Sequence, residues 1–193
     1  MWHPVTRVTA LLDANILYPA PMRDIFLQLA ADGFFRAKWT ADIHREWIDA
    51  LVRNEPRRDR STLERTRRLM DTAAPDFLVT GYQTLIPGLD LPDPDDRHVL
   101  AAAIIGRSDV IVACNLRDFP EDTVANYFVK ALHPDDFLTN HLEVMPCPYC
   151  HAVRKIRTRL VAPNISVHRY LAILAELRLE ATAAELARYS ERL

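Results

Sequence analysis

Short apolar runs rich in β-branched residues alternate with segments of helical apolar spacing over the first two thirds of the chain. The runs at residues 8–12, 34–39, 77–79, 110–112 and 127–132 predict strands. The segments between them predict helices that start near Pro21, Thr40, Ser61 and Asp93. Strands that alternate with helices are typical of an α/β fold with a mostly parallel sheet.

Capping residues mark where these helices begin and end. Thr40 is a candidate N-cap, and Ser61–Glu64 has the spacing of a capping box. Gly33 and Gly106 follow the last apolar positions of two helices, where glycine commonly ends a helix.

From His133 onward the apolar spacing is helical throughout. Asp135 and Ser166 are candidate caps, and Thr182–Glu185 predicts another capping box. Prolines at positions 146 and 148 interrupt the chain at the start of this part. We therefore expect an α/β domain over residues 1–145 and a C-terminal helical extension over residues 146–193.

Composition and charge narrow the classes of function. The 193 residues include only 4 glycines, so there is no glycine-rich loop to cradle a phosphate, and no serine lies in a G-x-S-x-G elbow. No apolar run approaches the length needed to span a bilayer, and the first residues do not resemble a signal peptide. Three cysteines, an odd number, argue against a disulfide framework. We expect a cytoplasmic protein.

The net charge is −2, but basic and acidic residues are concentrated in different parts of the chain. Arginines are concentrated between Arg53 and Arg68, and a second basic run extends from Arg154 to Arg159. Such runs are usually solvated helix faces, but they are also the kind of surface that holds a phosphate backbone. The candidate RNA-binding residues are Arg53, Arg57, Arg58, Arg154 and Lys155.

Acidic and amide side chains follow the predicted strands. Asp13 ends the first strand, Asn115 and Asp118 follow the strand at 110–112, and Asp93, Asp95 and Asp96 begin the helix that leads into it. Functional groups collect beyond the carboxyl ends of parallel strands, so these groups are expected to converge. Converging carboxylates repel one another unless a cation lies among them, and an all-oxygen set suits Mg²⁺ or Mn²⁺.

Each of these acids also has an ordinary structural interpretation. Asp96 is a candidate helix cap, Glu46 a solvent-exposed helix residue, and Asp118 a turn residue. Asp13 is different, because it lies inside an apolar stretch where burial of a carboxylate requires a partner.

Three motifs, in order and spacing, resemble those of PIN domains across roughly residues 7–140. The first is Leu11–Leu17, the second is Leu91–Ile104, and the third is Ser108–Pro120. The resemblance implies a parallel sheet sandwiched between helices and Mg²⁺-dependent cleavage of RNA. It also implies a toxin of the VapC type, a homodimer, and an antitoxin protein that covers the site.

The resemblance assigns roles to individual residues. By motif match, the four acidic catalytic positions are Asp13, Glu46, Asp96 and Asp118, of which Asp13, Asp96 and Asp118 are the candidate metal ligands. The supporting neighbours are Asn15, Asp93 and Asn115. Glu46 is supported only by its position in a predicted helix.

Two features depart from or extend the family pattern. Cys114 lies in the Val112–Ala113–Cys114 segment, where the family often has a threonine, so one hydroxyl of the site is missing. Residues 163–167 resemble the C-terminal extension of a bacterial branch of PIN proteins.

Other functions remain open at this point. The missing threonine is compatible with a catalytically inactive PIN-fold module that binds RNA or protein. A phosphatase of the haloacid-dehalogenase type also begins with a strand and an Asp. However, it needs a second Asp where this chain has Asn15.

The sequence Cys147–Pro148–Tyr149–Cys150–His151 has several interpretations. It matches a haem-attachment signature, half of a zinc site and a disulfide-exchange pair. Each of these lacks its usual context in the rest of the sequence, so we expect two incidental cysteines in a linker.

Overall fold

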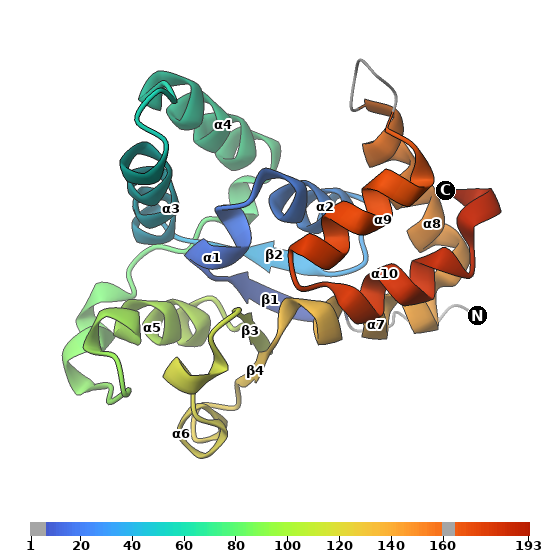
Figure 1. Ribbon diagram of the computed structural model, residues 1–193. Coiled ribbons are helices and arrows are strands. Elements are labelled where there is room, and N and C mark those ends of the chain that lie inside the picture. Colours follow the sequence, from blue (N-terminus) through green and yellow to red (C-terminus); the bar gives the residue numbers. More distant parts are fainter. Residues whose placement is uncertain (1–6, 160–164) are drawn as a thin grey trace. The chain divides into compact units, whose positions relative to one another are not determined.

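A computed structural model describes residues 7–159 and 165–193 of the chain (Figure 1). The residues before Arg7, and Pro163 and Asn164 of the extension motif, lie outside this part. Among the helices described, none is long and apolar enough to cross a membrane.

The described chain divides into two compact units. The first contains residues 7–18 and 35–132, and the second contains Pro19–Phe34 and His133–Leu193. The single helix in Pro19–Phe34 is thus grouped with the C-terminal helices. The predicted boundary between a domain at residues 1–145 and a helical extension at residues 146–193 stays a prediction.

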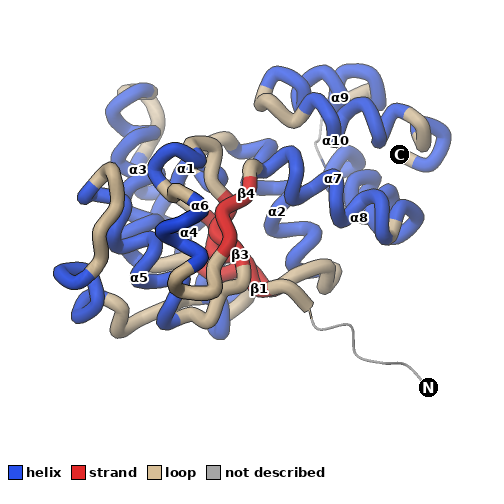
Figure 2. The backbone as a smooth tube through the Cα atoms, turned by 90° about the horizontal axis from the view of Figure 1, so that it is seen from below, coloured by secondary structure: helices blue, strands red, loops and turns tan. Residues whose placement is uncertain are grey.

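A four-stranded parallel sheet forms the centre of the first unit, with its strands drawn in red in Figure 2. The strands are β1 (Thr9–Leu12), β2 (Arg36–Lys38), β3 (Val110–Val112) and β4 (Lys130–Leu132), in the order β2-β1-β3-β4. Leu11 is in register with Lys38 on one side and with Ile111 on the other. The predicted α/β class with a parallel sheet and C-terminal helices is therefore confirmed.

The strand order places a topological switch point between β1 and β3. The chain leaves β1 for β2 on one side of the sheet and later returns to form β3 on the other side. Every residue of β1 and β3 is buried, as expected for central strands of a parallel sheet covered on both faces. At such a point the loops after the two strands diverge and leave a crevice beyond their carboxyl ends.

The first unit also contains five α-helices within the described residues. They are α1 (Ala14–Leu17), α3 (Ala41–Asn54), α4 (Arg60–Ala73), α5 (Arg97–Ile105) and α6 (Glu121–Ala125). The helix α5 packs against both β1 and β3, and α1 packs against α3. The helix α5 thus lies directly on the two central strands, while α3 packs on the short helix that follows β1.

Capping residues account for most of the helix boundaries in this unit. Thr40 caps α3 as predicted, because its hydroxyl accepts a hydrogen bond from the Ile43 amide at 3.0 Å. The predicted capping box at Ser61 is wrong: α4 begins one residue earlier, and the Asp59 carboxylate accepts from the Ser61 amide. A carboxylate is the stronger acceptor for an exposed helix start.

The strand predicted at 77–79 is also wrong. Only an isolated bridge forms there, between Trp39 and Leu78, next to a 3₁₀ turn at Pro75–Phe77. Trp39 donates to the Phe77 carbonyl at 3.0 Å and accepts from the Val79 amide at 2.8 Å, and the pairing extends no further.

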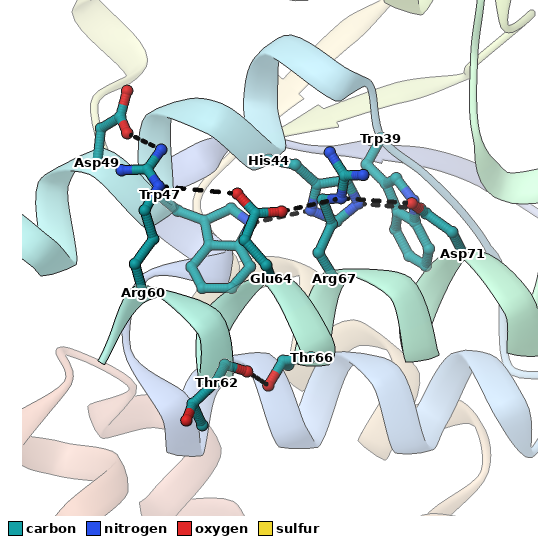
Figure 3. Close-up of polar contacts among 10 residues, drawn as sticks. All are labelled: Trp39, His44, Trp47, Asp49, Arg60, Thr62, Glu64, Thr66, Arg67 and Asp71. Carbon is teal, nitrogen blue, oxygen red and sulfur yellow. Dashed lines mark hydrogen bonds and ion pairs between the residues drawn. The ribbon is translucent and has the colours of Figure 1, made fainter. Parts of the chain in front are cut away.

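A buried polar network links α3, α4 and the residue after β2 (Figure 3). His44 Nδ1 accepts a hydrogen bond from Trp47 Nε1 at 3.0 Å. His44 Nε2 lies 3.1 Å from Asp71 Oδ1. Trp39 Nε1 donates to the same Asp71 oxygen at 3.0 Å. Burial lowers the pKa of His44 despite the neighbouring Asp71 carboxylate, so the ring is neutral at pH 7 and donates to Asp71. The network fixes the arginine-rich helix α4 to the rest of the unit.

The second unit is entirely helical within the described residues. Its helices are α2 (Ala20–Ala31), α7 (Pro134–Val144), α8 (Pro146–Arg159), α9 (Val167–Glu176) and α10 (Glu180–Ala187). The helix α10 packs against α7 and α9, and α2 packs against α8. Gly33 adopts a φ of 83° just after α2, which confirms the predicted helix stop. Cys147 and Cys150 lie inside α8, so the expectation of a linker there is wrong.

Asp135 has a different role from the one predicted. His133, not Asp135, caps α7. The buried Asp135 carboxylate instead accepts the amides of Ala181 and Thr182 at 2.8 Å and the Thr182 hydroxyl at 2.6 Å. The capping box predicted at Thr182 is therefore also wrong, because α10 begins at Glu180. The Ser166 cap of α9 is confirmed by its bond to the Arg169 amide.

Replacing Asp135 with alanine is expected to lower the free energy of unfolding by about 2–4 kcal/mol. The substitution leaves three donors at the start of α10 without their acceptor. Chemical denaturation monitored by circular dichroism measures the effect. The exposed neighbour provides a matched control, since Asp136→Ala is expected to change stability by less than about 0.5 kcal/mol. Equal effects of the two substitutions would show that the cap contributes little.

Candidate active site

Asp13 lies directly after β1, at the switch point of the sheet. Its backbone amide donates to the Val112 carbonyl at 3.1 Å, which ties it to the end of β3. One carboxylate oxygen accepts from the Ala14 amide at 2.7 Å and so caps α1. The side chain is buried, with a residue exposure of 7%. A buried carboxylate therefore occupies the crevice between the two central strands.

Asn15 holds this carboxylate in place. Its amide nitrogen donates to the second oxygen of Asp13, and its carbonyl oxygen accepts from the backbone amide of Cys114 at 3.1 Å. One side chain thus connects the loop after β1 with the loop after β3. The predicted supporting role of Asn15 has a defined geometry here.

Asp96 enters from the start of α5. It ends a 3₁₀ turn at Pro94–Asp96, and the cap of this turn is Asp93, whose carboxylate accepts from the Asp95 amide at 2.9 Å. The Asp96 side chain makes no capping hydrogen bond. The capping role considered for Asp96 thus belongs to Asp93, and the Asp96 carboxyl is left to interact with Asp118.

Asp118 enters from the loop after β3. It closes a 3₁₀ turn at Leu116–Asp118, and the Asn115 side-chain amide donates to its carboxylate. Three separate chain segments therefore supply acidic groups to the same end of the sheet. They are the loop after β1, the start of α5 and the loop after β3.

The pKa values of two of these groups show how closely the charges interact. Burial raises the pKa of Asp13 to about 6, with the charges of Glu46 and Asp118 adding to the rise and the Ala14 amide opposing it. Burial and the charges of Asp13, Asp118 and Asp93 raise the pKa of Asp96 to about 7. At neutral pH this cluster therefore carries negative charge that the side chains around it do not fully compensate.

Glu46 reaches the cluster from α3 and is paired with a histidine. His98 Nε2 lies 2.8 Å from Glu46 Oε1. Burial lowers the pKa of His98, but the hydrogen bond and charge of Glu46, with smaller contributions from Asp42 and Asp13, raise it overall. Its other ring nitrogen is buried and has no hydrogen-bond partner among the described residues.

His98 is a residue that sequence reasoning missed. It lies two positions after Asp96, on the first turn of α5. The spacing from Asp96 gave no signal, because residues two apart in a helix do not share a face. Its partner on α3 could not be read from the sequence.

The other predicted residues are distributed as follows. Asp95 is exposed, and its charge is not among the main causes of the shifts of Asp13 and Asp96. Arg53, Arg57 and Arg58 are exposed at the end of α3 and in the loop after it, with Arg58 paired to Glu55 at 2.7 Å. Arg154 and Lys155 belong to the second unit, where Arg154 is exposed and Lys155 pairs with Asp32 at 2.9 Å.

The donors in the crevice suit a hard divalent cation. They are carboxylate oxygens, and burial together with the charges of Asp13, Asp118 and Asp93 raises the pKa of Asp96. In residues 7–159 and 165–193, no three acidic, histidine or cysteine side chains already surround a common point as ligands of a metal. The chemistry of the donor set therefore fits such an ion, while its side chains are not gathered into a finished coordination shell.

Comparison with known families assigns the chain. A family model described as a PIN domain matches residues 9–117, more than half of the sequence. The chain belongs to the PIN-domain family. A second model, described as the VapC50 C-terminal domain, matches residues 134–188. The PIN-domain match contains Asp13, Glu46, Asp93 and Asp96, and it ends one residue before Asp118.

One curated relative matches clearly. It is "Putative ribonuclease VapC50" from Mycobacterium tuberculosis (strain ATCC 25618 / H37Rv), which is 38% identical over 109 residues. The match covers 54% of this chain and 64% of the relative, so the alignment spans less than two thirds of that protein. No solved structure matches this PIN-domain chain.

Charge in the crevice is expected to make the metal-free protein less stable as pH rises. The folded-state pKa values of Asp13 and Asp96 lie above the ordinary 3.8, so the folded protein binds more protons than the unfolded chain in this range. Stability contributed by these groups therefore falls between about pH 4 and pH 7. Asp96→Asn is expected to raise the melting temperature at pH 8 by a few degrees and to leave it unchanged at pH 4.

Thermal unfolding in EDTA at the two pH values measures this effect. Asp95→Asn is the matched control, because it removes the same charge from an exposed position in the same turn. An equal stabilisation by both substitutions would mean that general charge, and not the crevice, is responsible.

Proposed function

We propose that this PIN-domain chain is a divalent-metal-dependent endoribonuclease and the toxin of a toxin–antitoxin pair. The observation that carries the proposal is the convergence of Asp13, Asp96 and Asp118 at the switch point, which raises the pKa of the first two. The likeness to a relative named as a ribonuclease supports the choice of reaction.

Three carboxylates would hold the cation, namely Asp13, Asp96 and Asp118. When bound, Mg²⁺ or Mn²⁺ supplies positive charge to the phosphodiester and to the leaving oxygen. Asn15 orients Asp13, and Asn115 orients Asp118, so two of the three ligands are held by neighbouring amides. Asp93 supports the third by fixing the turn that carries Asp96.

Hydrolysis of a phosphodiester requires a group that accepts a proton from the attacking water. A carboxylate whose pKa is raised toward neutrality is suited to this task. Asp13 or Asp96 is the proposed acceptor, because both carboxylates lie in the crevice and their pKa values are raised in the metal-free protein. Glu46 lies at the edge of the cluster, where its contact with His98 holds it in place. Its proposed role is to orient the water.

The RNA backbone requires cationic contacts outside the acidic crevice. The exposed residues Arg53, Arg57 and Arg58 belong to the same unit as the acids, and they are the proposed contacts in that unit. Arg154 and Lys155 provide a second basic surface on the C-terminal helices. The proposed antitoxin would inhibit the enzyme by placing a basic side chain among the acids, where charge-assisted hydrogen bonds are strong.

Cleavage of single-stranded RNA in the presence of Mg²⁺ or Mn²⁺ is the first test. Asp13→Asn and Asp96→Asn are each expected to reduce the cleavage rate by ~100-fold or more, because each removes a charge that binds the cation or takes the proton. EDTA is expected to abolish cleavage, and added Mg²⁺ to restore it. Asp95→Asn is the control and is expected to retain the wild-type rate.

Two results would contradict the nuclease proposal. Cleavage that persists in the Asp13→Asn, Asp96→Asn double variant would come from another site or from a contaminant. A wild-type protein that binds RNA without cleaving it, at any concentration of either metal, would indicate an inactive RNA-binding module.

Expression in a bacterium tests the toxin part of the proposal. The wild-type chain is expected to arrest growth, and Asp13→Asn, expressed to the same level, is expected to permit it. Arrest by both proteins would mean that toxicity does not depend on the acidic site. Coexpression of a small protein encoded immediately upstream of this chain is expected to relieve the arrest.

A further inference from the structure

Two cysteines lie in the first turn of α8. Cys147 is exposed, whereas Cys150 is buried with a residue exposure of 1%. Both are thiols and are not joined in a disulfide. The PIN domain and the proposed nuclease reaction make no use of either residue.

The helix places the two thiols at a separation that a disulfide can bridge. Residues three apart in an α-helix have Cα atoms about 5 Å apart, given its rise and radius. The Cα atoms of a disulfide are usually about 4.4–6.8 Å apart. Cys147 and Cys150 lie on neighbouring positions of one helix face, so the bond would need side-chain rotation and little movement of the backbone.

A guanidinium group lies against the exposed sulfur. Arg192 Nη1 is 2.8 Å from Cys147 Sγ and donates to it. Arg192 is positioned by the 3₁₀ turn at Ser190–Arg192, which packs on α8. Arg157 of α8 holds the same turn by donating to the Leu193 carbonyl at 3.1 Å. The cation is thus fixed next to the thiol by a second, independent contact.

The two thiols have different environments. Cys147 is exposed near the start of α8, with the Arg192 guanidinium against its sulfur. Burial raises the pKa of Cys150, and the Cys147 sulfur adds to this rise while Arg192 opposes it. In such a pair, the exposed thiol with a cationic neighbour reacts first with the small disulfide. The buried thiol then attacks the mixed disulfide that forms on its neighbour.

We propose that Cys147 and Cys150 form a reversible redox pair that exchanges with small disulfides such as oxidised glutathione. The Cys147 thiolate attacks one sulfur of the small disulfide, whose S–S bond breaks, and the departing thiolate takes up a proton. Cys150 then loses its proton and attacks the Cys147 sulfur, which releases the second small thiol. One small disulfide is reduced to two thiols, and the two cysteines are oxidised to one disulfide.

Reaction of the reduced full-length chain with oxidised glutathione tests the proposal. Intact mass and peptide mapping of the wild type are expected to show a Cys147–Cys150 disulfide with the loss of two hydrogens. Cys150→Ser is expected to retain one glutathione on Cys147. Cys147→Ser is expected to leave Cys150 unmodified, because that thiol is buried. The exposed Cys114 of the first unit is an internal control that is expected to keep its adduct.

Arg192 is tested through the rate at which Cys147 is alkylated, measured relative to Cys114. Arg192→Gln is expected to slow the reaction of Cys147 several-fold, and Arg192→Lys to restore much of the rate, because it keeps the charge. A purely structural role of Arg192 would make both variants equal, or would speed the reaction by exposing the thiols.

Three results would overturn the redox pair. One is a wild-type protein in which Cys147 keeps its glutathione as Cys114 does. Another is a disulfide formed only between chains. The third is stoichiometric zinc in the purified protein that shields both thiols, since the pair would then be a metal site. None of these results bears on the nuclease proposal, which the RNA assay tests separately.

Discussion

The repulsion among carboxylates at the switch point of the sheet is the constraint on which the rest of the first unit depends. Asp13 is fixed there by the pairing of β1 with β3, because its own amide bonds to the last residue of β3. Asp96 and Asp118 are brought to it by α5 and by the loop after β3. A fold that gathers acids in this way loses stability unless a cation or a proton compensates them. Such a cost is typical of functional sites and not of structural ones.

The neighbouring side chains are arranged to keep the acids in position. Asn15 and Asn115 each donate to one of them, and Asp93 takes over the capping role that would otherwise engage Asp96. His98 restrains Glu46 at the edge. The amides and caps therefore leave the charged oxygens of the cluster oriented toward the crevice. This arrangement is what a divalent ion and a phosphodiester would require.

Features that depend on local sequence pattern were predicted correctly. The predictions were wrong or missing where a partner distant in sequence determines the role of a side chain. Buried apolar runs located the central strands, and the acids that follow them identified the crevice, because parallel strands end at one edge. The caps at Asp59 and His133 were missed because neighbouring residues matched the usual capping patterns. Asp135 and His98 were misread or missed because their partners, Thr182 and Glu46, are distant in sequence. The relation of Arg192 to Cys147 is hidden for the same reason.

Calorimetric titration of the metal-free protein with Mn²⁺ tests the central claim most directly, because it needs neither RNA nor turnover. Wild type and Asp95→Asn are expected to bind the ion with similar affinity, while Asp13→Asn and Asp96→Asn are expected to bind it far more weakly or not at all. Binding that is equal in all four proteins, or absent from the wild type, would contradict the assignment of the acidic crevice as a metal site.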